Sequence, residues 1–180
     1  MAHPTHLALL LLVVGAAASV GAQPSEEVPI GGTLRDATLR GLNGPPRKLS
    51  EFLGKPLIIN VWASWCGPCR AEMASLERLA WLDESHDLII IGISTDDYED
   101  RAVAALTSSN ATITHFIDRN LLMEKMLGAS RLPLTVLVAS DGRVLDKIYG
   151  AREWDDTAAL AHIERVFRGP SKDAEHDAPR

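Results

Sequence analysis

The two cysteines of this 180-residue chain lie in one pentapeptide, Trp65-Cys66-Gly67-Pro68-Cys69. The pentapeptide follows an apolar run, residues 56–62, that is typical of a buried strand. If the segment that begins at Cys66 is helical, Cys66 lies where unpaired backbone amides and the helix dipole favour a thiolate. Cys69 then lies one turn later and points inward. The spacing predicts that Cys66 attacks a disulfide and that Cys69 resolves the mixed disulfide.

Two other interpretations of the pair are weaker. A zinc site would need two further cysteine or histidine ligands at matching spacing, but there is no second cysteine pair and the six histidines are scattered. A purely structural disulfide would close a loop of only two intervening residues, and would therefore constrain little of the unfolded chain. We expect a redox-active Cys66–Cys69 disulfide and no metal site or cofactor.

Apolar runs and helical periodicity predict alternating strands and helices along the chain. The predicted strands cover residues 56–62, 88–94, 114–117, 135–139 and 144–149, and the last two form a hairpin around 140–143. The predicted helices run from Cys66 to about residue 84, and over residues 95–106, 120–127 and 155–167. Residues 28–49 are expected to be irregular or to form short strands.

The residues around the cysteines resemble a known family. The stretch 57–73, LIINVWASWCGPCRAEM, resembles the active-site strand and helix of a thioredoxin-fold protein. More narrowly, it is similar to the TlpA/ResA/CcmG group of extracytoplasmic thioredoxin-like proteins. KLSEFLGKPLIIN at 48–60 and LPLTVLVASDGRV at 132–144 match the same group, and GAREW at 150–154 resembles TlpA in particular.

The resemblance covers residues 28–169 and implies one α/β domain. The implied fold is a thioredoxin fold with an N-terminal extension, and with an added strand and helix between the active-site helix and a cis-proline. Outside this domain, we expect residues 1–22 to form a signal peptide and residues 170–180 to form a disordered polar tail.

The resemblance also implies roles for residues outside the pentapeptide. Pro133 matches the cis-proline, which leaves the backbone of Leu132 free to pair with an extended substrate. Asn60 supports the active site where cytoplasmic thioredoxins have a buried aspartate, and asparagine cannot titrate. Glu72 is the candidate replacement, which would tune the thiol pKa values and exchange a proton with Cys69. The alternative is that Glu72 is an ordinary solvated helix residue.

The tryptophans and the residues between the cysteines add further expectations. Trp65 is expected to cover the disulfide and contact clients, whereas Trp62 and Trp81 are expected in or near the core. Gly67-Pro68 is the dipeptide of reducing thioredoxins. It favours a reduction potential near that of thioredoxin, about −270 mV, over that of the oxidant DsbA.

Residues 7–18 form an apolar stretch that resembles a secretory signal peptide, with cleavage after Ala22. No Lys or Arg precedes Leu7, so an uncleaved membrane anchor is the alternative. Export would place the dithiol in a periplasmic or other extracytoplasmic compartment, where a partner must keep it reduced. By resemblance, that partner is a membrane electron donor of the DsbD/CcdA type. The net charge of −6, without a basic stripe, argues against nucleic acid as a partner.

These expectations favour an extracytoplasmic thiol:disulfide oxidoreductase that reduces client disulfides. By resemblance, the clients are apocytochrome c or proteins of copper-site assembly, including that of a copper oxidase. Two alternatives remain open: a disulfide oxidant or isomerase of the Dsb kind, and a copper(I) chaperone that uses Cys66 and Cys69 as soft ligands.

Overall fold

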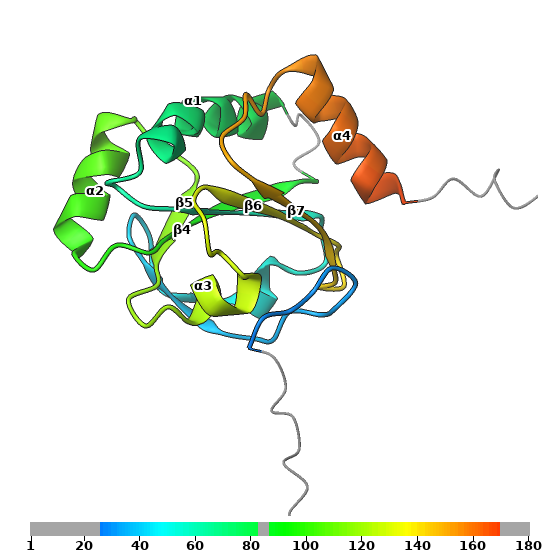
Figure 1. Ribbon diagram of the computed structural model, residues 1–180, viewed down its shortest axis with the longest axis horizontal. Helices are drawn as coiled ribbons and strands as arrows, with labels where there is room; N and C mark the ends of the chain where they lie inside the picture. Colours follow the sequence, from blue (N-terminus) through cyan, green and yellow to red (C-terminus); the bar gives the residue numbers. More distant parts are fainter. Residues whose placement is uncertain (1–25, 83–86, 170–180) are drawn as a thin grey trace, which may run out of the picture.

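The computed structural model describes residues 26–82 and 87–169, which form a central sheet covered by helices on both faces (Figure 1). The predicted signal segment and polar tail lie outside these residues. The sheet has seven strands in the order β2-β1-β5-β4-β3-β6-β7. The strands are β1 (Thr38–Gly41), β2 (Arg47–Lys48), β3 (Leu57–Trp62), β4 (Ile89–Ser94), β5 (Thr114–Ile117), β6 (Leu134–Val138) and β7 (Val144–Tyr149).

β3 lies inside the sheet, and every residue in it is buried. It pairs in parallel with β4 and antiparallel with β6. β5 continues the parallel part of the sheet, whereas β1 and β7 pair antiparallel with their neighbours. Because β3, β4 and β5 run in parallel, the loops that follow them emerge at one edge of the sheet, where Cys66 also lies.

The longer helices cover one face of the sheet, and the shorter ones cover the other (Figure 1). The first face carries α1 (Gly67–Leu82), α2 (Glu99–Ser108) and α4 (Thr157–Arg168). The opposite face carries α3 (Leu122–Leu127), the 3-10 helix η1 (Leu49–Phe52) and the N-terminal segment. Between α1 and Pro133 the chain forms two strand–helix pairs, β4–α2 and β5–α3, which include the predicted insertion. The fold is thioredoxin-like, as the resemblance predicts.

Alternate side chains of β3 enter different parts of the core, because successive residues of a strand point to opposite faces. Leu57, Ile59 and Val61 pack with η1 and α3. Ile58 and Trp62 face α1 and its neighbours. Asn60 points to the same face as these two residues, so its amide is buried beneath α1.

The predicted strands match the observed ones to within about one residue at each end, but two expectations about side chains and helices are wrong. Trp81 is 75% exposed, not part of the core. It lies two residues after Leu79, which is buried, so it points to the opposite side of α1. The second helix begins at Glu99 and not at Thr95, because Asp96 binds the loop before Cys66 instead of starting the helix.

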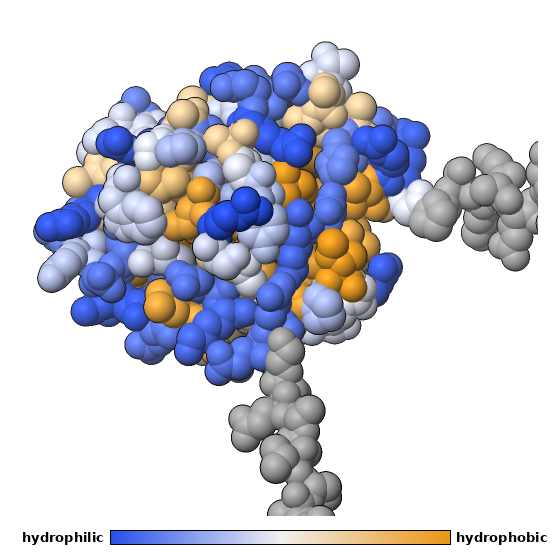
Figure 2. All heavy atoms as spheres, in the orientation of Figure 1, coloured by the Kyte–Doolittle hydropathy of each residue, from blue (hydrophilic) through white to orange (hydrophobic). Residues whose placement is uncertain are grey.

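Among the described residues, no helix combines the length and the apolar character needed to cross a membrane. The face of the molecule seen in Figure 2 is largely hydrophilic, with hydrophobic residues in scattered patches.

Gly92 of β4 leaves the space that the His115 ring fills. The two residues are neighbours across β4 and β5, and a Cβ at Gly92 would lie 2.0 Å from Nδ1 of His115. His115 is buried, and burial lowers its pKa to about 4, so the ring is neutral at pH 7.

Replacing Gly92→Ala should therefore lower the free energy of unfolding of the oxidised protein by about 1–3 kcal/mol, because the ring of His115 must move. Urea unfolding measures this change. Gly44→Ala is the matched control, since a Cβ there meets no atom within 4 Å, and it should change stability by less than about 0.5 kcal/mol. Equal losses in the two variants would contradict the proposed packing.

Candidate active site

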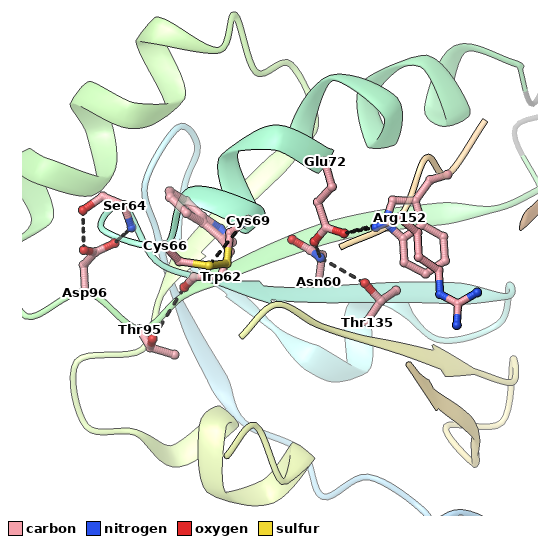
Figure 3. The surroundings of a disulfide bond; sticks show 11 residues. Asn60, Trp62, Ser64, Cys66, Cys69, Glu72, Thr95, Asp96, Thr135 and Arg152 are labelled. Carbon is pink, nitrogen blue, oxygen red and sulfur yellow. Dashed lines mark hydrogen bonds between the residues drawn. A yellow bond between two sulfur atoms is a disulfide. The ribbon is translucent and has the colours of Figure 1, made fainter. Parts of the chain in front are cut away.

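Cys66 and Cys69 form a disulfide at the start of α1, with their Cα atoms 5.3 Å apart (Figure 3). Cys66 is 6% exposed, whereas Cys69 is fully buried. Cys66 is therefore the more accessible residue of the pair. The order in which the two cysteines react remains a prediction.

The start of α1 provides a favourable site for a thiolate at Cys66. The backbone amide of Cys69 donates a hydrogen bond to Sγ of Cys66 at 3.2 Å. The first turn of this 16-residue helix has no acidic side chain, so the positive end of the helix dipole acts on the sulfur unopposed. Both features favour a thiolate over a thiol at this kind of position once the disulfide is reduced.

The loop that leads into Cys66 is fixed by a buried carboxylate. Asp96 is 2% exposed and accepts hydrogen bonds from the backbone amide of Ser64 at 2.8 Å and from its hydroxyl at 2.6 Å. The hydroxyl of Ser94 donates a third hydrogen bond to the same carboxylate at 2.8 Å. The end of β4 therefore holds the chain two residues before Cys66.

Glu72 lies one turn after Cys69, with its carboxylate buried between α1 and the sheet (Figure 3). The amide of Asn60 donates to Oε1 at 2.8 Å and also to Oγ1 of Thr135 at 3.0 Å. The indole of Trp154 donates to Oε2 at 3.0 Å, and the backbone amide of Arg152 does so at 3.2 Å.

Burial raises the pKa of Glu72, and the hydrogen bonds from Trp154, Asn60 and Arg152 oppose that rise. The alternative that Glu72 is a solvated helix residue is wrong, since its exposed fraction is 1%. A carboxyl with a raised pKa next to a dithiol is suited to proton transfer.

The peptide bond between Leu132 and Pro133 is cis, as the resemblance predicts. Leu132 is half-buried and packs against the cluster that contains both cysteines. Trp65 is 70% exposed and Trp62 is fully buried, as expected for both. Gly67 and Pro68 are exposed at the start of the helix.

Sequence reasoning missed several residues of this site. Asp96 falls within a predicted helix, residues 95–106, although a carboxylate that follows a buried strand is also suited to bind a neighbouring loop. Trp154 belongs to a family-like segment for which the sequence predicts no role at the site. The ring of His115 packs edge-on against Trp62 with centroids 5.5 Å apart, a contact that no pattern in the sequence indicates. The pairing of distant strands brings these residues together, so no local pattern identifies them.

A disulfide at the start of the helix after a central strand, with a cis-proline beside it, defines the thioredoxin-like thiol–disulfide oxidoreductases. The family model described as Redoxin matches residues 29–163. The chain therefore belongs to the Redoxin family, and within it to the thiol–disulfide oxidoreductases of the DsbE and ResA type.

Two curated relatives support this assignment. The thiol:disulfide interchange protein DsbE of Vibrio cholerae is 32% identical over 149 residues, which cover 78% of this chain and 79% of the relative. The thiol-disulfide oxidoreductase ResA of Geobacillus thermodenitrificans is 26% identical over 139 residues, which cover 77% and 79%. A solved structure from Chlorobium tepidum, described as a DsbE-type interchange protein, shares the fold with a TM-score of 0.71. The two sequences are 24% identical, and the match covers 77% of this chain and 98% of the solved chain.

The Asp96 carboxylate provides a test of how the site is built. Asp96→Ala should lower the free energy of unfolding by about 1–3 kcal/mol, because it leaves buried donors of Ser64 and Ser94 without an acceptor. The amide of Ser64 should also exchange its hydrogen faster. Asp97→Ala is the matched control, because Asp97 is the exposed neighbour, and it should change neither quantity appreciably. Unchanged exchange at Ser64 in the Asp96 variant would show that the carboxylate does not hold the loop.

Proposed function

We propose that this protein is an extracytoplasmic thiol–disulfide oxidoreductase that reduces disulfides of client proteins. The observation that carries the proposal is the disulfide between Cys66 and Cys69 at the start of α1, in which Cys66 is the more accessible residue. The Gly67-Pro68 dipeptide between the cysteines favours the reducing direction.

In the proposed reaction, the thiolate of Cys66 attacks one sulfur of a client disulfide. The bond between Cys66 and the client forms, the client disulfide breaks, and its second sulfur leaves as a thiolate that takes up a proton. Cys69 then loses its proton and attacks Sγ of Cys66. The Cys66–Cys69 bond forms, the mixed disulfide breaks, and the client leaves with two thiols while this protein is oxidised.

Glu72 is proposed as the group that takes the Cys69 proton in the second step. Cys69 is fully buried, so water does not reach its thiol directly. The Glu72 carboxylate lies one helical turn away, and its raised pKa brings it closer to that of a thiol. Asn60 does not titrate, and its role is to orient the carboxylate from below.

Trp65 and Leu132 are proposed to contact the client. Trp65 is exposed and precedes Cys66 in the chain, and Leu132 packs against the cluster that contains both cysteines. An extended client segment pairing with this backbone would place its disulfide near Cys66. The proposed clients are apocytochrome c or copper-site assembly proteins, and the proposed electron donor is of the DsbD/CcdA type. These assignments and the extracytoplasmic location rest on the family resemblance and on residues 7–18.

The direction of electron flow is tested by the reduction potential of the Cys66–Cys69 pair, titrated against a defined thiol–disulfide buffer. We expect a value near that of thioredoxin, about −270 mV. A Cys69→Ser variant, which cannot form the internal disulfide, controls for mixed disulfides with the buffer. A potential near that of DsbA, about −120 mV, would mean that the protein oxidises its clients instead.

Replacing Glu72→Gln tests the proton-transfer role with little change in shape. Oδ1 of Asn60 has no hydrogen-bond partner, so the amide can rotate to accept from the new side chain. We expect the second step, in which Cys69 displaces the client, to slow by roughly 100-fold at pH 7, the lower end for loss of a general base. The rate of this step in the wild-type protein should rise with pH as Glu72 loses its proton. Because burial raises the pKa of Glu72, the inflection of this pH–rate profile should lie above the ordinary pKa range of a glutamate. The profile of the Glu72→Gln variant should lack the inflection.

Glu164→Gln, on α4 away from the disulfide, is the control and should keep the wild-type profile. If the pH–rate profile of the Glu72→Gln variant keeps the wild-type inflection, Glu72 is not the proton acceptor. The proposed roles of the cysteines would not be affected.

A further inference from the structure

The loop between β7 and α4, residues 150–156, is attached to one side of α1 (Figure 1). Next to the contacts with Glu72, the hydroxyl of Ser75 donates to the backbone oxygen of Arg152 at 3.2 Å. One turn further, Arg78 pairs with Asp155 at 2.6 Å and with Glu153 at 3.1 Å. The three α1 residues are spaced three apart, so they lie along one side of the helix. The loop is therefore held against the active-site helix over about two turns.

Trp154 is the buried residue of this loop. Its side chain is 1% exposed and packs with Ile58, Leu76 and Leu137. Packing alone could be provided by another large apolar ring, but an indole also carries one N–H donor that must find a partner when buried. That donor is used on Oε2 of Glu72 at 3.0 Å.

The Glu72 carboxylate depends on such donors, because no cation compensates its charge. Among the ion pairs of residues 26–82 and 87–169, none includes Glu72. The guanidinium of Arg152 points away from the carboxylate (Figure 3). The acidic groups of the loop are also engaged elsewhere: Glu153 and Asp155 pair with Arg78, and Asp156 caps α4 by accepting from the amide of Ala159. Asn60 of β3 and Thr135 of β6 do not titrate.

On α1, Cys69 lies one turn before Glu72 and is held in the disulfide. The other charged residues of this helix are engaged elsewhere or exposed: Glu77 accepts from the amides of Thr112 and Ile113, Arg78 pairs with the loop, and Arg70 is exposed. On the sheet side, His115 of β5 lies over Gly92, the β4 neighbour of Asn60, and its lowered pKa keeps it neutral. The hydrogen bond from Trp154 favours the charged form of Glu72 and so opposes the rise in pKa that burial causes. Hydrogen bonds to a buried charged group are the strong kind.

We propose that Trp154 is a positioning residue of the exchange reaction: its indole N–H holds the Glu72 carboxylate, ionised, where it takes the proton of Cys69. The inference rests on the proposed acid–base role of Glu72 and extends the active site to a loop that follows it by about 80 residues. Trp154 does not touch the reacting sulfurs; it acts only through Glu72.

The test removes the N–H and keeps the ring. Trp154→Phe is the simple variant, and replacement of Trp154 by benzothienylalanine, in which sulfur takes the place of the N–H, preserves the shape of the indole if phenylalanine leaves a gap. The first readout is the pKa of Glu72, followed by carbon NMR of labelled glutamate in the oxidised protein. We expect both variants to raise this pKa, because the charged form loses a donor.

The second readout is the release of glutathione from Cys66, measured by rapid mixing of the reduced protein with oxidised glutathione. We expect roughly tenfold slower release at pH 7 in the Trp154 variants, since one hydrogen bond to a charged group is lost. The inflection of the pH–rate profile should also move to higher pH. In a Glu72→Gln background, the same Trp154 replacements should cause no further slowing. Trp81→Phe, at the exposed end of α1, is the control and should change neither readout.

The outcomes separate this inference from the proposed function. An unchanged Glu72 pKa in both Trp154 variants, with Glu72→Gln still slow, overturns the role of Trp154 and leaves that of Glu72 intact. If the Trp154 replacements still slow the release of glutathione in the Glu72→Gln background, the inference is also overturned. The indole would then act on the reaction without Glu72. If Glu72→Gln keeps the wild-type rate, the acid–base role fails, and with it the inference.

Discussion

The burial of β3 on both faces is the constraint on which the rest of the structure depends. A strand covered on both sides needs apolar residues throughout, and β3 departs from this only at Asn60. β4, the parallel neighbour of β3, and β5 beyond it run in the same direction as β3, so the loops that follow them emerge where α1 begins. The disulfide therefore lies at an edge of the sheet that other loops can reach, while the strand beneath it stays rigid.

The buried carboxylates Asp96 and Glu72 organise the two sides of this site. Asp96 accepts hydrogen bonds from the loop before Cys66 and fixes the direction from which the chain enters the helix. Glu72 accepts hydrogen bonds from β3 and from the loop between β7 and α4. Burying either charge is costly unless donors surround it, so each carboxylate requires several segments to meet. The hydrogen bonds that stabilise the fold at these two carboxylates therefore also position the polar groups near the disulfide.

The sequence was sufficient for the parts of the structure that depend on local pattern. The strands 57–62 and 89–94 consist mostly of apolar residues, and Gly128 ends its helix in the left-handed conformation that glycine favours. Side-chain direction was harder to predict. Trp81 is apolar and helical, but whether it is buried depends on what covers that side of α1, and nothing in its neighbourhood along the chain records this.

By itself, the sequence determined the close cysteine pair and its place after a buried strand, because these depend on local runs of residues, and its resemblance to a known family indicated the class of fold. Only the tertiary structure decided which groups surround Glu72. Asn60, Thr135 and Trp154 are separated from it by 12, 63 and 82 positions. Hydrogen bonds between residues so far apart depend on strand order and register, which arise from the packing of the whole chain and not from any local run of residues.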